Sequence, residues 1–189
     1  MIIGAVLELI VFSLPSLAYM RTLQRRGRTS ADARAAVGWQ LGNAETYRLA
    51  VAVALVLLAI TYLAIRAIPT AAISIHSNLH ATYGRATTGG GYAAIVLLAI
   101  TEEILFRGLI AGVLIRRYGF AAGNLLQALI FFAPHLLLLV VSTAIWPLLP
   151  VQLVAGWLLG LLREKSGSIG PSSLAHVAAN LLAPLLVTI

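Results

Sequence analysis

Six apolar runs, separated by short polar stretches, divide the amino-acid sequence. Each run approaches the roughly 20 residues that a helix needs to cross a bilayer. An open sheet would leave its edges unpaired in lipid, and these runs lack the alternation of a membrane barrel. The pattern therefore predicts an all-α integral membrane protein, a bundle of about six transmembrane helices. The expected spans are residues 2–19, 49–68, 92–115, 120–141, 148–162 and 171–187.

Charged residues and prolines mark where several of these spans end. Arg116 and Arg117 close the third run, and residues 163–165 close the fifth. Pro147 and Pro150 interrupt the chain after the fourth run. Because proline cannot continue a helix, this pair predicts a tight reversal between the fourth and fifth spans.

Composition supports lipid as the surrounding solvent. Of 189 residues, 60% are hydrophobic and 10% are charged, whereas a soluble domain is about 45–50% apolar and about 25% charged. This length predicts a single domain, residues 1–189. No basic residue precedes the first apolar run, so we expect a retained membrane segment rather than a signal peptide. The absence of cysteine excludes disulfides, thiolate catalysis and Cys-ligated zinc.

The net charge of +7 comes from basic residues that flank the apolar runs. This placement argues against a nucleic-acid surface, which would gather them on one face. Lys and Arg accumulate in cytoplasmic loops, so the charges predict a multi-pass cell-membrane protein with both termini extracytoplasmic. The connections after spans one, three and five carry Arg21, Arg25, Arg26, Arg28, Arg34, Arg116, Arg117, Arg163 and Lys165, against Arg66 and Arg85 on the other side.

Three of the predicted spans contain polar groups at membrane depth, where each is a functional hypothesis by default. Glu103 and Arg107 are four residues apart, so they share a helix face and can pair. Glu102 is rotated by about 100° from Glu103 and is free to face a cavity. His135 lies deep in the fourth span. His176 and Asn180 lie four apart on the sixth, where they could form an oxyanion hole or join neighbouring helices. We expect these groups to meet.

Three ordered motifs in the second half of the chain resemble those of the CPBP family. Residues 102–108, EEILFRG, fit its EExxxR motif; residues 131–135 fit FxxxH and residues 176–180 fit HxxxN. This family comprises the type II CAAX prenyl endopeptidases and bacteriocin-processing relatives. The resemblance covers residues 92–189, which it makes the catalytic core, whereas the two spans of residues 2–68 carry no motif.

The resemblance implies an intramembrane endopeptidase that hydrolyses a membrane-associated peptide or a protein terminus at the bilayer. Its catalytic residues would be Glu102, Glu103, His135, His176 and Asn180. Glu102 and His135 would activate a water molecule. His176 and Asn180 would stabilise the oxyanion, and Glu103 would support the site together with Arg107 and Phe131.

The same residues allow three other interpretations of the protein's function. Two His and two Glu could hold zinc, with Glu102, His135 and His176 as ligands, although no HExxH pair is present. A non-catalytic immunity or scaffolding protein could share the fold. A proton-coupled carrier could use Glu102 as a relay, but the inverted repeats of such carriers are not visible. His76 and His80 have metal-compatible spacing but lack an obvious third ligand, so we expect surface histidines.

The charge distribution predicts the topology in a form that epitope tags can test. A tag between Arg21 and Arg34, and a tag beside Arg116 and Arg117, should both be cytoplasmic, because these connections carry most of the positive charge. Accessibility of each tag in intact and permeabilised cells measures this. Detection of either tag in intact cells would overturn the orientation.

Overall fold

The structure, a computed structural model, describes residues 2–69, 86 and 88–186. His76 and His80 lie outside these residues. Within them the chain is helical and contains no strand. The elements are α1 (Ile2–Arg25), α2 (Ser30–Ala36), α3 (Ala44–Arg66), α6 (Gly89–Glu102), the π-helix η1 (Glu103–Ala111), α7 (Gly112–His135), α8 (Leu138–Val141), the 3₁₀-helix η2 (Thr143–Leu148), α9 (Leu149–Ser166) and α10 (Gly170–Leu186).

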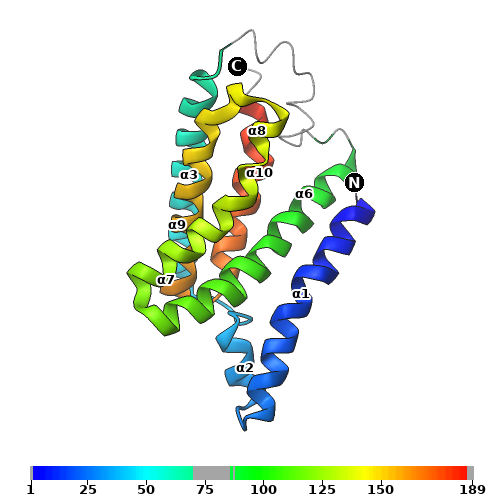
Figure 1. Cartoon of the computed structure of the whole chain (residues 1–189), viewed down its shortest axis with the longest axis vertical. Helices are drawn as coiled ribbons and strands as arrows, with labels where there is room; N and C mark the ends of the chain where they lie inside the picture. Colours follow the sequence, from blue (N-terminus) through cyan, green and yellow to red (C-terminus); the bar gives the residue numbers. More distant parts are fainter. Residues whose placement is uncertain (1, 70–85, 87, 187–189) are drawn as a thin grey trace.

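Three helical stretches of the described chain are long and apolar enough to cross a membrane, namely Ile2–Arg25, Ala44–Arg66 and Thr143–Ser166. The prediction of an all-α membrane protein is confirmed. Figure 1 shows α3, α9 and α10 packed together in one half, and α1 beside α6 in the other. The rod made by α6, η1 and the first part of α7 runs between the halves. The start of α1 and the end of α10 lie at the same end of the bundle.

Most span boundaries follow the predicted pattern. The break between the third and fourth spans is real: Gly119 leaves the helical conformation at φ 77° and ψ 170°, and α7 reverses there. The fourth span is shorter than expected, because α7 ends at His135 and the short elements α8 and η2 follow. Pro147 lies inside η2, and a proline occupies the first turn of α9, where its missing N–H costs nothing.

The basic stretch after the first span contains a helix that the hydrophobic pattern did not predict. Helix α2 begins with a capping box, in which the Thr29 side chain accepts from the Asp32 backbone and the Asp32 carboxylate accepts from the Thr29 backbone. This reciprocal pair satisfies donors that a helix start leaves open. The short helix folds the basic connection back against the end of α1.

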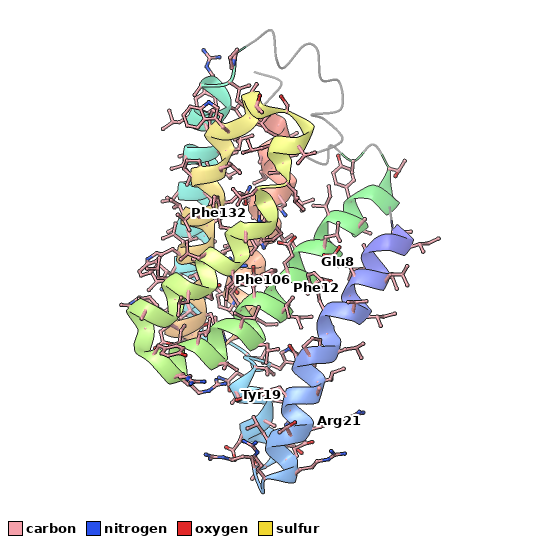
Figure 2. All side chains as sticks on the ribbon, in the orientation of Figure 1. Glu8, Phe12, Tyr19, Arg21, Phe106 and Phe132 are labelled. Carbon is pink, nitrogen blue, oxygen red and sulfur yellow. The ribbon has the colours of Figure 1, made fainter. Side chains whose placement is uncertain are left out.

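The outside of the bundle is apolar, and its largely apolar interior contains several buried polar and charged side chains. Leu7, Val11 and Leu14 of α1 are more than half exposed, as are side chains on α3 and α8. In contrast, Glu103 and Arg107 are completely buried. Figure 2 shows Glu8 and Phe12 on the side of α1 that faces α6 and η1, whereas Arg21 points away from the bundle. An apolar perimeter suits lipid, and it leaves polar contacts to hold the interior together.

Helices α7 and α9 pack closely through polar side chains and glycines. The Gln127 amide donates to the Gly156 carbonyl at 2.7 Å, and the Asn124 amide donates to the Trp157 carbonyl at 3.0 Å. Both side chains are fully buried. Gly160 provides the space that they need, because a methyl group there would overlap the Asn124 side chain.

We therefore expect Gly160→Ala to destabilise the protein by about 1–3 kcal/mol, the range for overpacking a well-filled core. Thermal unfolding in detergent measures the effect. Gly4→Ala is the matched control, because nothing lies within 4 Å of a methyl group at that position. Equal unfolding temperatures for the two variants would contradict the packing explanation.

Candidate active site

The two adjacent glutamates lie where α6 passes into the π-helix η1. Glu103 is completely buried, and its Oε1 accepts a hydrogen bond from Arg107 at 2.9 Å. The predicted ion pair is therefore present. The Glu102 side chain is 26% exposed and has no part in that pair. The Glu103 carboxylate is thus paired in the interior, whereas the neighbouring Glu102 carboxylate is accessible.

The wide turn of η1 was not predicted. A π-helix has i→i+5 hydrogen bonds and often occurs at functional sites. It begins at Glu103 and ends at Ala111, so it contains the whole EExxxR motif apart from Glu102. The fit is close on one side, because a methyl group added to Gly108 would lie 3.0 Å from the Val37 carbonyl oxygen.

His176 of α10 connects the two glutamates. Its Nδ1 lies 2.8 Å from Glu103 Oε1, and its Nε2 lies 3.8 Å from Glu102 Oε2. A carboxylate can only accept a hydrogen bond, so Nδ1 carries the proton that donates to Glu103. Glu103 therefore orients the imidazole, and Nε2 is left facing Glu102.

His135 lies at the end of α7, and its Nδ1 is 2.8 Å from the Phe131 carbonyl oxygen. The same tautomer argument applies, since a carbonyl oxygen accepts only. The proton is on Nδ1, and in neutral His135 the Nε2 atom is an acceptor without that bond. His135 is also within electrostatic range of Glu102 and His176.

Phe131 is the common neighbour of these groups. The Arg107 guanidinium carbon lies 4.1 Å from its ring centroid, a cation–π contact. The rings of Phe106, His135 and His176 have centroids at 5.1, 4.7 and 6.1 Å. Phe131 is 1% exposed, and the rings of both histidines pack against it.

Asn180 is the outlier among the predicted residues. It lies one turn beyond His176 on α10, but its side chain is exposed whereas His176 is buried. No hydrogen bond joins it to another candidate residue in the described chain. His135 and His176 pack against Phe131, and Glu102 and Glu103 both approach His176.

Residues 85–182, slightly more than half of the chain, match the family model of type II CAAX prenyl endopeptidase Rce1-like proteins. The chain belongs to this family. No curated protein and no solved structure matches it. The family match contains all three motifs and confirms the resemblance drawn from them. Membership in this protease family, together with the apolar helices, assigns the protein to a membrane.

The zinc alternative for this Rce1-like protein needs three ligands at one point. Among residues 2–69, 86 and 88–186, no three His, Cys, Asp or Glu side chains form a group that could hold a metal ion. Glu102 and His176 approach each other at 3.8 Å. Donor atoms of a zinc site each lie about 2 Å from the metal, so these two are near enough to share one ion, but no third side chain of the described residues joins them.

Glu8 of α1 is a residue that the sequence reasoning missed. It is partly buried, lies in a membrane span, and interacts electrostatically with Glu102. The neighbouring turn of α1 packs against the site, because Phe12 contacts Phe106 edge to face at 6.4 Å. Its position in an apolar run could have identified it, since an acidic residue inside a span is a functional hypothesis by default.

The buried ion pair makes a testable difference between the two glutamates of the motif. Glu103→Gln should lower the free energy of unfolding by about 3–5 kcal/mol, because it leaves the Arg107 charge buried without a partner. Thermal unfolding and the yield of folded protein measure this. Glu45→Gln, an exposed residue in the first turn of α3, is the control and should have little effect.

The double variant Glu103→Gln with Arg107→Gln separates charge from shape. It removes both charges and should recover part of the stability that Glu103→Gln loses, since no uncompensated charge remains. If the double variant loses as much free energy of unfolding as the two single variants lose in total, the two charges are not coupled.

Proposed function

We propose that this Rce1-like protein is an intramembrane endopeptidase that hydrolyses a membrane-associated peptide or protein terminus. The observation that carries the proposal is the chain Glu103–His176–Glu102, with distances of 2.8 and 3.8 Å. A buried carboxylate that orients an imidazole beside a second carboxylate is an arrangement suited to moving protons. Membership in a protease family supports peptide hydrolysis in general.

In the proposed first step Glu102 is the general base. It takes a proton from a water molecule while the water oxygen attacks the scissile carbonyl carbon. A carbon–oxygen bond forms, and the carbonyl electron pair becomes an oxyanion. The Nε2 atom of neutral His135 can accept the other hydrogen of the same water, because its Nδ1 proton is engaged with the Phe131 carbonyl. Glu102 suits this role because it is partly accessible and not committed to Arg107.

In the second step His176 and Asn180 stabilise the oxyanion. His176 donates to Glu103 through Nδ1, so its donor to the substrate is a protonated Nε2. Asn180 lies one turn further along α10 and is exposed, so its amide can reach a bound substrate. The intermediate then collapses: the carbon–nitrogen bond breaks, and the proton held by Glu102 passes to the leaving amine.

The substrate class follows from the place of the site and from the family. The candidate residues lie within helices of a membrane bundle, so a substrate has to present its scissile bond at the bilayer. The family description reads type II CAAX prenyl endopeptidase. We propose that the substrate is a peptide held at the membrane, and a lipidated carboxy-terminal peptide is the first one to test.

Glu102→Gln is the sharpest test of the mechanism. The change keeps the shape of the side chain but removes the base, so cleavage of a farnesylated CAAX peptide by the purified protein should be abolished. Its unfolding temperature should match that of the wild type, since Glu102 is outside the buried pair. Glu45→Gln serves as the control and should retain full activity. A fully active Glu102→Gln variant would rule out the proposed base.

Asn180→Ala should behave differently. It removes one oxyanion donor, a loss typically worth about 10²–10³ in rate, and so leaves weak activity. A chelator should leave the wild-type rate unchanged. Loss of activity with chelator, restored by zinc, would contradict the glutamate mechanism and make His135, His176 and a glutamate metal ligands.

A further inference from the structure

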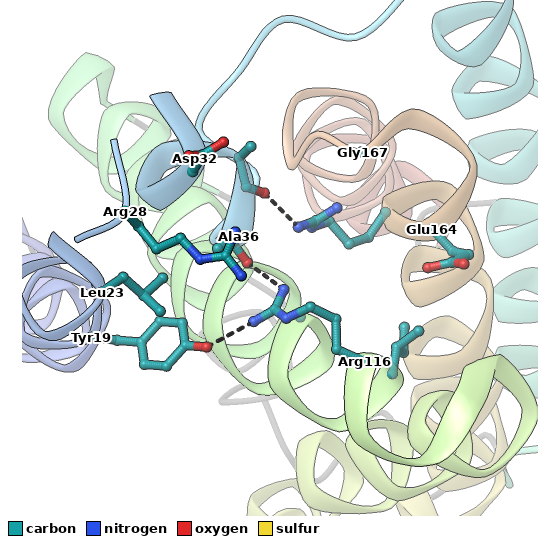
Figure 3. A pocket seen from close by; sticks show the side chains of 12 residues that line it. Tyr19, Leu23, Arg28, Asp32, Ala36, Arg116, Glu164 and Gly167 are labelled. Carbon is teal, nitrogen blue, oxygen red and sulfur yellow. Dashed lines mark hydrogen bonds between the residues drawn. The ribbon is translucent and has the colours of Figure 1, made fainter. Parts of the chain in front are cut away.

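A cavity of about 580 Å³ lies between α1, α2, α7 and α9 (Figure 3). It is lined by residues from the ends of these helices and does not include Glu102, His135 or His176. It is therefore separate from the candidate active site. Its lining includes the side chains of Arg28, Arg116 and Arg163, together with Tyr19.

Two of the three arginines, Arg116 and Arg163, donate to neutral oxygen atoms. Arg116 donates to the Ala36 carbonyl at 2.8 Å and to the Tyr19 hydroxyl at 3.1 Å. Arg163 donates to the Ala35 carbonyl at 3.3 Å, and its Nε is buried without a partner among the described residues. Arg163 is 7% exposed. In Figure 3 the Arg28 side chain points toward Arg116 beside Ala36.

No carboxylate among the described residues forms a close ion pair with this group, although Glu164 interacts electrostatically with Arg163. The ion pairs of the described chain all lie at the active site, and none involves the three cavity arginines. Asp32 also lines the cavity, but its Oδ2 accepts from Thr29 at 3.3 and 2.8 Å in the capping box of α2. Glu164 is exposed and stands apart from Arg28 and Arg116 in Figure 3. Three positive charges and two carboxylates therefore line the cavity, and one of the carboxylates, Asp32, is engaged in the capping box.

Guanidinium groups that converge repel one another unless an anion lies between them. Arginine presents a planar fork of N–H donors that matches the oxygen atoms of a phosphate group. The three arginines come from different parts of the fold: Arg28 precedes α2, Arg116 lies on α7 and Arg163 on α9. The Tyr19 hydroxyl accepts from Arg116, so its own proton is free to donate to the same anion.

The position of the cavity indicates the source of the phosphate. Helix α1 ends at Arg25 and α9 ends at Ser166, so the cavity lies where these membrane-spanning helices end, at headgroup depth. Leu23 and Ile115 add apolar wall beside the arginines. Basic pockets between membrane helices at this depth suit anionic lipid headgroups.

We propose that this cavity binds the phosphate group of an anionic phospholipid. The lipid connects α1 and α2 to α7 and α9, whose ends line the cavity. Its phosphate oxygens accept from Arg28, Arg116 and Arg163, and the excess positive charge selects an anionic lipid over a zwitterionic one. This inference does not depend on the proposed peptidase activity.

The test measures binding of dioleoylphosphatidylglycerol to the full chain in detergent by native mass spectrometry. Dioleoylphosphatidylcholine and soluble glycerol phosphate are run in parallel at equal concentration. Arg28→Gln and Arg116→Gln should each weaken phosphatidylglycerol binding about tenfold or more, the loss expected for a charged hydrogen bond to phosphate. Arg26→Gln and Arg117→Gln are matched controls, because both are exposed neighbours outside the cavity lining. They should stay within about twofold of the wild type.

Arg28→Gln keeps the test valid if Arg116→Gln fails to fold, because no hydrogen bond of the Arg28 side chain supports the fold. An equal loss of binding in Arg26→Gln would mean general surface charge and overturn the site. Equal binding of phosphatidylcholine would overturn the selection for anionic lipid. Displacement of phosphatidylglycerol by glycerol phosphate at equal concentration would identify a soluble phosphate as the ligand and overturn the lipid.

Discussion

The ion pair between Glu103 and Arg107 organises the interior of the bundle. Neither side chain is exposed to any extent, and their atoms approach at 2.9 Å. Removing two charges from water costs several kcal/mol for each ion, and only close mutual contact and further hydrogen bonds offset that cost. The same Glu103 oxygen accepts from His176, and the Arg107 guanidinium lies over Phe131. The pair thus connects η1 to α10 and to α7, and the positions of both histidines depend on it.

Adjacent residues of one motif divide two tasks. Glu103 is committed to structure because its oxygen is already shared by Arg107 and His176. Glu102 has no comparable partner, and a quarter of its side chain is accessible. A general base has to exchange protons, whereas a residue that orients its neighbour has to keep one position. In the proposed mechanism, Glu103 orients the His176 imidazole while Glu102, the preceding residue, stays outside the ion pair and acts as the base.

Local sequence spacing predicted the contacts that depend on one helix alone. The separation of Glu103 from Arg107 by four residues indicated their pairing, and Arg116 and Arg117 at the end of an apolar run indicated the break at which α7 reverses. The π-helix could not be predicted in this way, because its wide turn depends on neighbours such as the Val37 carbonyl beside Gly108. The exposure of Asn180 likewise depends on what surrounds α10, since the same helix face carries the buried His176.

The Phe131 ring should shift the NMR resonances of the two histidines that pack against it. An aromatic ring shifts the resonances of protons that lie near its face, and the shift falls steeply with distance. The ring centroids of His135 and His176 are 4.7 and 6.1 Å from that of Phe131. The chain contains four histidines, so the imidazole signals form a small set in which these two are displaced, His135 more strongly. Phe131 and His135 both lie on α7, whereas His176 lies on α10. A change in the separation of the two helices would therefore move the His176 resonances and leave those of His135 in place as an internal reference.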